Sequence, residues 1–203
     1  FTIEDTTAPA VMDAMDATVE CDGAGNAADL DAWLASNGGA SATDACSGVT
    51  WSNDFDALSD DCGATGAATV TFTATDDCGN ATSTTATFTI EDTTAPAVMD
   101  AMDATVECDG AGNAADLDAW LASNGGASAT DACSGVTWSN DFDALSDDCG
   151  ATGAATVMFT ATDDCGNATS TTATFTAKWK VENQKAYNSS CNCKKDVAVL
   201  CEA

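Results

Sequence analysis

The stretch TATDDCGNATSTTATFTIEDTTAP, which runs from Thr73 to Pro96, contains the pattern that decides the fold. Residues 67–75, which overlap its start, alternate threonine with apolar side chains, and residues 81–90 end in the same alternation. A period of two predicts strands with one buried face. The DDCGN link between them contains Gly79 and Asn80, which both suit a positive φ. The sequence therefore predicts a β-hairpin whose two strands pair antiparallel.

The chain contains an internal duplication. Residues 1–87 recur as 88–174, and Thr71 against Met158 is the one difference. That difference falls on the threonine side of its strand, where a change of volume is tolerated better than in a core. We expect two domains, residues 1–87 and 88–177, with residues 1–3 as the end of a preceding last strand and 178–203 as a separate tail.

Each repeat predicts further short elements before the hairpin. An edge strand at Val11 and Met12 follows Pro9, and two more strands cover residues 17–21 and 49–51. Between these two strands we expect one helix, with Asn26 as its N-cap and Gly38 as its stop. Leu30, Trp33 and Leu34 share one face of that helix. We interpret this helix as a packing lid over the sheet edge.

Acidic side chains dominate the surface. The formal net charge is −28, and all five basic residues are lysines at or after Lys178. Such a surface repels nucleic acid and anionic membranes and attracts cations, so we expect no nucleic-acid partner, no membrane insertion and a saline or calcium-bearing medium. The chain has no histidine, hence no Ser-His or Cys-His pair, and we expect no enzyme activity.

Cysteines occur in equal number in the two repeats. Four fall in each repeat, namely Cys21, Cys46, Cys62 and Cys78, then Cys108, Cys133, Cys149 and Cys165. An even number in a small, loop-rich domain predicts disulfides and an oxidising, extracellular compartment. A zinc cluster is disfavoured because the cysteines do not form two CxxC pairs. Four cysteines allow three connectivities, and the spacing does not choose among them.

The segments DATVECDG, ATDACSGVTW, TVTFTATDDCGNAT and FTIEDTTAP follow one another in each repeat. In that order they resemble the immunoglobulin-like repeats of bacterial surface proteins and adhesins, especially the HYR-like type. The resemblance covers nearly all of each repeat. It implies an all-β fold of tandem immunoglobulin-like antiparallel β-sandwiches, each with one short inserted helix, together with secretion and a role in stalks, adhesins or extracellular fibres.

The resemblance also bears on the cysteines. In a sandwich of this kind, the connection after the second strand and the last hairpin lie at the same end. That placement favours Cys46 with Cys78 and Cys21 with Cys62. The alternative is Cys21 with Cys46 and Cys62 with Cys78.

Carboxylates gather where one repeat is expected to meet the next. The resemblance brings Glu91 and Asp92 to the hairpin residues Asp163, Asp164 and Asn167, and the equivalent set is Glu4, Asp5, Asp76, Asp77 and Asn80. Oxygen ligands on loops suit calcium better than zinc or copper. Related adhesin repeats are stiffened by calcium at their junctions, so the resemblance adds weight to a calcium site. The alternative is a group of solvated acids, and no organic cofactor is expected.

Two kinds of glycosylation signal occur. Asn80, Asn167 and Asn188 begin N-x-S/T sequons, although Asn80 also has a turn to form. Thr6 and Thr93 stand in DTT segments that are similar to a short O-glycosylation motif of some gliding bacteria. The many outward threonines are equally explained as plain β-formers.

The two ends suggest assembly. Residues 1–3 duplicate residues 88–90, so they need either an upstream repeat or a neighbouring protomer's sheet edge. The lysine-bearing tail is either a solvated terminus or a contact to an acidic face, and Cys191, Cys193 and Cys201 are odd in number. We expect a self-associating structural protein of a stalk or filament. The alternative is an adhesin whose loops, or whose Leu30, Trp33 and Leu34 face, bind a glycan or protein.

Overall fold

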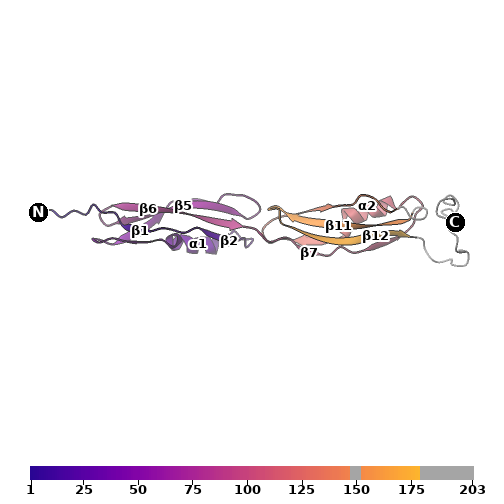
Figure 1. Ribbon diagram of the computed structural model, residues 1–203, viewed down its shortest axis with the longest axis horizontal. Helices are drawn as coiled ribbons and strands as arrows, with labels where there is room; N and C mark the ends of the chain where they lie inside the picture. Colours follow the sequence, from indigo (N-terminus) through magenta and orange to yellow (C-terminus); the bar gives the residue numbers. More distant parts are fainter. Residues whose placement is uncertain (147–151, 179–203) are drawn as a thin grey trace, which may run out of the picture. The chain divides into compact units, whose positions relative to one another are not determined.

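The computed structural model describes residues 1–146 and 152–178. They form two compact units. The first contains Phe1–Thr94 with Ala132–Gly135, and the second contains Ala95–Asp131 with the residues from Val136 onward. Figure 1 shows the elements of both units along the chain.

The first unit contains eight elements, of which the strand β6 is the last. They are β1 (Ala10–Met12), β2 (Ala17–Glu20), α1 (Ala27–Ala35), the 3-10 turn η1 (Asn37–Gly39), β3 (Ser41–Thr43), β4 (Val49–Asn53), β5 (Gly66–Asp76) and β6 (Ala81–Glu91). One sheet has four strands in the order β2-β6-β5-β4, and the other pairs β1 with β3. The predicted hairpin is confirmed, because β5 and β6 pair antiparallel with Thr75 opposite Ala81.

Alternation along the hairpin separates an inner from an outer face. Val70, Phe72 and Phe88 are fully buried, and the neighbouring threonines are more exposed. On the outer face, threonine and serine hydroxyls pair across the strands, as between Thr69 and Thr87 at 2.9 Å. Met158 in the second unit is 41% exposed, so the one difference between the repeats lies on the outer face as expected.

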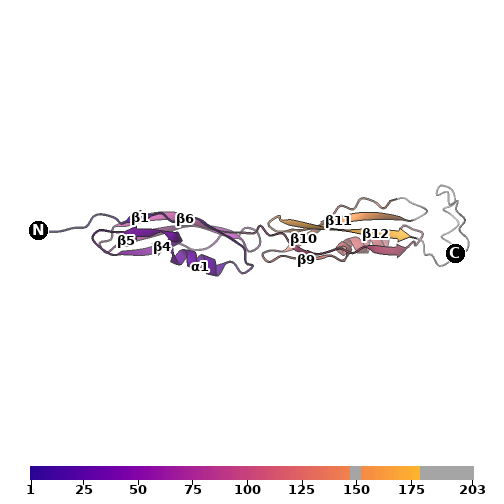
Figure 2. The ribbon, with the colours of Figure 1, turned by 60° about the horizontal axis from the view of Figure 1, so that its bottom comes forward.

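Helix α1 covers the inner face of the hairpin, to one side of β5 and β6 in Figures 1 and 2. Trp33 packs edge-on against Phe72, with ring centroids 5.2 Å apart, and its indole N–H donates to Met15 O at 3.1 Å. Leu30 is also buried. The packing-lid interpretation of this helix is therefore confirmed.

The helix begins and ends differently in detail from the prediction. Asn26 is the N-cap residue, but it has a φ of 48° and no side-chain capping bond, because its side chain bonds to the loop before the helix. The helix ends at Ala35, and Gly38 lies one turn later with a φ of 63°. A Cβ on Gly38 would press on Phe72 and Ala14, so this glycine also permits close packing.

The second unit repeats the same elements. They are β7 (Ala97–Met99), β8 (Ala104–Glu107), α2 (Ala114–Ala122), η2 (Asn124–Gly126), β9 (Ser128–Thr130), β10 (Val136–Asn140), β11 (Gly153–Asp163) and β12 (Ala168–Lys178). The sheet orders are β10-β11-β12-β8 and β7-β9. Trp120 on α2 packs against Phe159 and Phe175, which are fully buried.

Two expectations need correction. The sheets are not purely antiparallel, because β2 runs parallel to β6, with Ala17 opposite Phe88. The same pairing places residues 88–91 in the first sheet, so the boundary expected between residues 87 and 88 falls inside β6. The repeat period is visible in the letters, but its starting phase is not, because any starting residue gives the same self-match. A sandwich of two facing sheets in each unit stays a prediction.

Lys178, which was expected to be the first residue of the tail, belongs to the sheet of the second unit. Lys178 is the last residue of β12 and pairs with Glu107 of β8. Residues 179–203, with Asn188, Cys191, Cys193 and Cys201, lie outside the described part of the chain, and so does Cys149.

Candidate functional site

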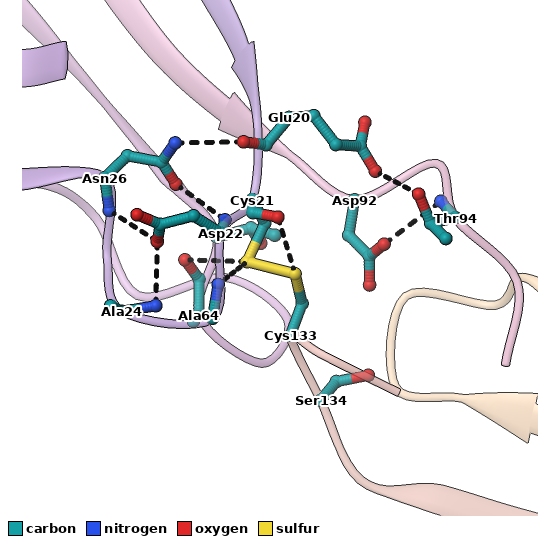
Figure 3. Close-up of a disulfide and its surroundings, with 12 residues drawn as sticks. Glu20, Cys21, Asp22, Ala24, Asn26, Ala64, Asp92, Thr94, Cys133 and Ser134 are labelled. Carbon is teal, nitrogen blue, oxygen red and sulfur yellow. Dashed lines mark hydrogen bonds between the residues drawn. A yellow bond between two sulfur atoms is a disulfide. The ribbon is translucent and has the colours of Figure 1, made fainter. Parts of the chain in front are cut away.

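Cys21 stands at the end of β2, in a loop that hydrogen bonds hold in one shape (Figure 3). Its backbone N–H donates to Glu91 O at 2.8 Å. Asp22 Oδ1 accepts from Ala24 N at 2.7 Å and from Asn26 N at 3.0 Å. These backbone bonds, Asn26 first, hold the pKa of Asp22 below its usual value. Asn26 is 2% exposed and its Nδ2 donates to Glu20 O at 2.9 Å. The loop is therefore preorganised.

A disulfide joins Cys21 to Cys133, which lies 112 residues later in the sequence. Cys133 belongs to the second sequence repeat, yet its segment, Ala132–Gly135, is part of the first compact unit. Cys21 and Cys133 are 7% and 8% exposed, so the bond is buried. Ala64 N donates to Cys133 O at 2.9 Å, which fixes the incoming segment against the loop before β5.

Two glycines permit this segment to approach. Gly23 and Gly63 have φ values of 76° and 58°. A Cβ on Gly23 would overlap Ala132 O, and one on Gly63 would overlap the backbone of Cys133. Because neither Gly23 nor Gly63 has a side chain, the backbone of Ala132–Gly135 can approach both loops closely. We call these two loops, residues 21–26 and 62–65, the receiving surface.

Both expected connectivities are wrong for Cys21. Its partner is neither Cys62 nor Cys46, and Cys46 and Cys78 are free, exposed thiols. Cys62 and Cys165 are each disulfide-bonded as well. The physical reason is that the cysteine that reaches Cys21 comes from the next repeat, which a pairing within one repeat does not include.

Cys46 and Cys78 occupy neighbouring loops of the first unit, as expected, but without a bond. The loop of Cys46 is fastened to the hairpin, since Gly48 N donates to Asp77 Oδ2 and Asp77 N donates to Ser47 Oγ, both at 3.3 Å. Partial desolvation raises the pKa of the Cys78 thiol, and the negative charges of Asp5, Asp76 and Asp77 raise it further. The thiolate of Cys78 is therefore disfavoured.

The hairpin residues Asp76 and Asn80 serve the turn. Asp76 is 5% exposed, and its two carboxylate oxygens accept from Cys78 N, Asn80 N and Asn80 Nδ2. The Asn80 side-chain bond is the main cause that holds the pKa of Asp76 below its usual value. Asn80 Nδ2 also donates to Asp5 O at 3.2 Å. An N-linked glycan would replace one of the two Nδ2 hydrogens that make these bonds.

Asp163 and Asn167 repeat this turn in the second unit. Asn167 N and Nδ2 donate to Asp163 at 2.8 and 3.0 Å. Desolvation opposes ionisation of Asp163, but the hydrogen bonds from Asn167, Gly166 and Cys165 together outweigh it and lower the pKa of Asp163.

The carboxylates predicted to bind calcium are brought together only in part. Within the first unit, Asp5, Asp44 and Cys46 offer ligand atoms that all lie within 4.8 Å of one another. Asp5 Oδ2 is buried without a hydrogen-bond partner, which fits a cation ligand. Of the predicted set, Asp76 is committed to the turn and Glu4 is exposed. Calcium prefers oxygen ligands alone, so the thiol of Cys46 fits it poorly.

The other predicted set spans both units. Glu91 and Asp92 belong to the first unit, and Asp163, Asp164 and Asn167 belong to the second. Asp92 is 8% exposed, and its Oδ1 accepts from Thr94 N at 3.1 Å, which closes a tight turn. A calcium site made by these five residues stays a prediction.

Glu20 holds the DTT segment that follows β6. Its carboxylate accepts from Thr94 Oγ1 at 2.7 Å, and from Thr93 N and Oγ1 at 2.9 and 2.8 Å. These bonds, Thr94 first, lower the pKa of Glu20. The Thr93 hydroxyl predicted to carry a glycan is therefore engaged, whereas Thr6 is exposed.

No protein-family model and no curated protein matches the chain. Among solved structures, it is similar to Drosophila N-cadherin EC1-4, with 12% identity over 85% of this chain and 50% of that chain at a TM-score of 0.33. It is also similar to the protocadherin gamma B7 extracellular cadherin domains 1-4, with 10% identity over 85% of this chain and 51% of that chain at a TM-score of 0.27. A third similar structure is that of the fibronectin(III)-like modules of Clostridium thermocellum CbhA, with 12% identity over 89% of this chain and 100% of that chain at a TM-score of 0.26.

The chain spans about half the length of the two cadherin structures. Neither helix in residues 1–146 and 152–178 is long and apolar enough to cross a membrane.

Proposed function

We propose that the chain is a structural, extracellular repeat protein whose immunoglobulin-like modules build a rigid stalk or filament. One observation carries the proposal: the disulfide from Cys21 to Cys133 ties one sequence repeat covalently to the next. A covalent tie between successive repeats suits a load-bearing array, because it keeps the repeats joined when the chain is pulled. Buried disulfides persist in oxidising compartments, which supports a secreted location.

Calcium would stiffen the same array. Its support is the buried, unpartnered Asp5 Oδ2 beside Asp44, in a chain with a net charge of −28. Carboxylates at this spacing repel one another unless a cation lies between them. Catalysis has no part in the proposal.

Electron microscopy of the native material, with and without a calcium chelator, tests the stalk or filament. We expect uniform thin fibres or rods, and we expect them to soften or separate in the chelator. X-ray scattering from the isolated chain is the matched measurement, and a rod gives a distance distribution with a long, linear tail. Dispersed monomers with a broad distribution of shapes in both conditions would refute the rigid spacer.

An adhesin is the second candidate, and its predicted binding face finds little support. Trp33 and Leu30 are 9% exposed and pack in the core, and Leu34 and Trp51 pack against that core. An exposed aromatic platform for a glycan or protein would need those rings at the surface. A glycan array probed with the labelled chain tests this candidate, because saturable binding to one glycan class would favour it.

A further inference from the structure

Asp5, Asp44 and Cys46 form a group of mixed ligands that calcium alone does not explain. One ligand atom from each residue, two carboxylate oxygens and one sulfur, lie within 4.8 Å of one another. All three residues belong to the first compact unit. The Cys46 thiol is free and exposed, so an ion can reach it from the solvent.

The pairing of β1 with β3 brings this group together. Ala10, the first residue of β1, lies opposite Thr43, the last residue of β3. Asp44 therefore leaves the sheet at the end where the segment before β1 enters it. Asp5 in that segment is held by the hairpin, because its carbonyl oxygen accepts from Asn80 Nδ2 at 3.2 Å. The group is thus built by two segments that the sheet fixes side by side.

Each carboxylate is fixed through its Oδ1 atom. Asp44 Oδ1 accepts from Cys46 N at 2.8 Å and from Ser47 N at 3.0 Å, and Asp5 Oδ1 accepts from Thr7 N at 3.0 Å. Asp5 Oδ2 is buried and has no hydrogen-bond partner within the described part of the chain. A buried carboxylate oxygen without a donor carries the cost of its desolvation. A cation beside this oxygen removes that cost, so the oxygen itself indicates a ligand.

The donor atoms select the kind of ion. Calcium and magnesium prefer oxygen ligands, and copper(I) prefers sulfur. Zinc accepts both, with carboxylate oxygens at about 2.0–2.2 Å and a cysteine sulfur at about 2.3 Å. Three protein ligands with water in the fourth position is one of the usual zinc geometries. The net charge of −28 attracts divalent cations to the chain.

We propose that Asp5, Asp44 and Cys46 bind one zinc ion, with a water molecule in the fourth position. The Cys46 thiol loses its proton to the buffer as its sulfur binds the ion. Calcium competes for the two carboxylates but does not displace this proton. The site goes beyond the filament function, which does not require zinc.

The second repeat limits the number of zinc ions. Cys133, the counterpart of Cys46, is bonded to Cys21, so its sulfur is not available as a thiolate. We therefore expect one zinc ion per chain rather than two.

Titration calorimetry with zinc chloride tests the site in the full-length variant C191S/C193S/C201S, which lacks the cysteines of residues 179–203. Cobalt(II) is the spectroscopic probe, because its bond to a thiolate gives a charge-transfer absorption. We expect one site for either metal and the thiolate absorption with cobalt. A chain without a zinc site, cobalt binding without that absorption, or peptide mapping that finds Cys46 in a disulfide would overturn the proposal.

Cys46 and Cys78 provide a matched pair of thiols. Both are free and exposed, and of the two Cys46 contributes to the ligand group. Cys46→Ser should lower the zinc affinity by at least about a hundredfold and remove the cobalt absorption, since it deletes a ligand. Cys78→Ser should leave both unchanged. Equal effects of the two substitutions would refute the assignment of Cys46.

Asp5 and Glu4 provide a matched pair of acids. Asp5→Asn keeps an oxygen for Thr7 N and replaces the unpartnered oxygen, whereas Glu4→Gln removes the same charge from an exposed neighbour. Asp5→Asn should weaken zinc binding roughly tenfold or more, and Glu4→Gln should not. Equal losses would assign the binding to the general negative charge and overturn the site.

Calcium titrations of the same variants separate the two ions. Cys46→Ser should leave the calcium affinity unchanged, because calcium uses the carboxylates alone. A loss of calcium affinity as large as the loss of zinc affinity would contradict a specific bond from the sulfur to zinc.

The zinc site and the filament function fail separately. Native fibres that take up no zinc would refute the site and leave the filament. Zinc bound by dispersed chains, with the effects of Cys46→Ser and Asp5→Asn as expected, would keep the site and refute the filament.

Discussion

Gly23 and Gly25 lie two residues apart in one loop, with φ values of 76° and 84°. Only Gly23 faces an incoming backbone, that of Ala132, while Gly25 has nothing within contact distance of an added Cβ. Alanine at either position carries the cost of a positive φ, about 1 kcal/mol. Gly23→Ala adds a clash, and this difference isolates the approach of Ala132.

We therefore predict that Gly23→Ala lowers the yield of the Cys21–Cys133 bond during refolding, and that Gly25→Ala does not. Peptide mapping after refolding in a glutathione buffer measures the yield. The free energy of unfolding in urea should fall further for Gly23→Ala than for Gly25→Ala. Equal losses would contradict the receiving surface as described.

Cys78 should react slowly with alkylating reagents. Desolvation and the charges of Asp5, Asp76 and Asp77 raise its pKa, so less thiolate is present at a given pH. In a Cys46→Ser background we expect its iodoacetamide rate at pH 8 to lie below that of a short cysteine peptide. The rate should keep rising at pH values where the peptide's rate has levelled off, as followed by mass spectrometry. A rate equal to the peptide's would contradict the acidic surroundings.

Helix α1 depends on one tryptophan. Trp33 contacts Phe72 and Phe88 and is 9% exposed, so Trp33→Ala leaves a cavity where three rings met. We expect a loss of about 3–5 kcal/mol in the free energy of unfolding of the first unit. Urea denaturation of the full chain measures it, with the second unit as an internal reference.

The repeats themselves supply the control for Trp33→Ala. Thr71→Met copies the residue at the equivalent position of the second repeat, on the outer face. Its effect should stay within about 0.5 kcal/mol, as for other surface changes. A small loss for Trp33→Ala, comparable to that of Thr71→Met, would show that α1 is not part of the core.

The elements could be predicted from the sequence where local chemistry determines them. Alternating Val70, Phe72 and Ala74 require a strand, and the spacing of Leu30 and Trp33 requires a helix. The parallel pairing of β2 with β6 could not be predicted, because it joins residues 71 positions apart and leaves no local pattern. The hydrogen bond from Asn26 Nδ2 to Glu20 O could not be predicted either, because it takes the side chain away from the helix that it was expected to cap.

At the scale of the whole molecule, repulsion among the acids opposes folding. The net charge is −28, and the lysines begin only at Lys178. Raising sodium chloride from about 0.01 M to about 1 M shortens the screening length from about 30 Å to about 3 Å. We predict a rise in melting temperature of about 5 °C or more, which corresponds to about 1 kcal/mol.

Calcium can be separated from plain screening in the same experiment. At matched ionic strength, calcium chloride should raise the melting temperature more than sodium chloride if Asp5 and Asp44 share an ion. Differential scanning calorimetry measures both curves. Equal curves would leave screening as the whole effect and argue against a calcium site.

The candidate site could be predicted from the sequence only in part. The sequence identified the cysteines and acidic residues as candidates, and it correctly predicted that Cys46 and Cys78 lie in neighbouring loops. The partner of Cys21 was missed, because a bond across 112 residues depends on how the second repeat enters the first unit's loops. A repeated sequence offers every pairing twice, and only three-dimensional placement distinguishes them.

The Cys21–Cys133 bond also determines how the protein responds to mechanical tension. When the chain is pulled from its two ends, the sulfur bridge carries the load and residues 22–132 cannot be drawn out. Reduction would release that hidden length, about 370 Å for the sequence separation of 112 between Cys21 and Cys133 at about 3.3 Å per residue. A force microscope should therefore record a long extra extension in dithiothreitol that is missing in oxidising buffer.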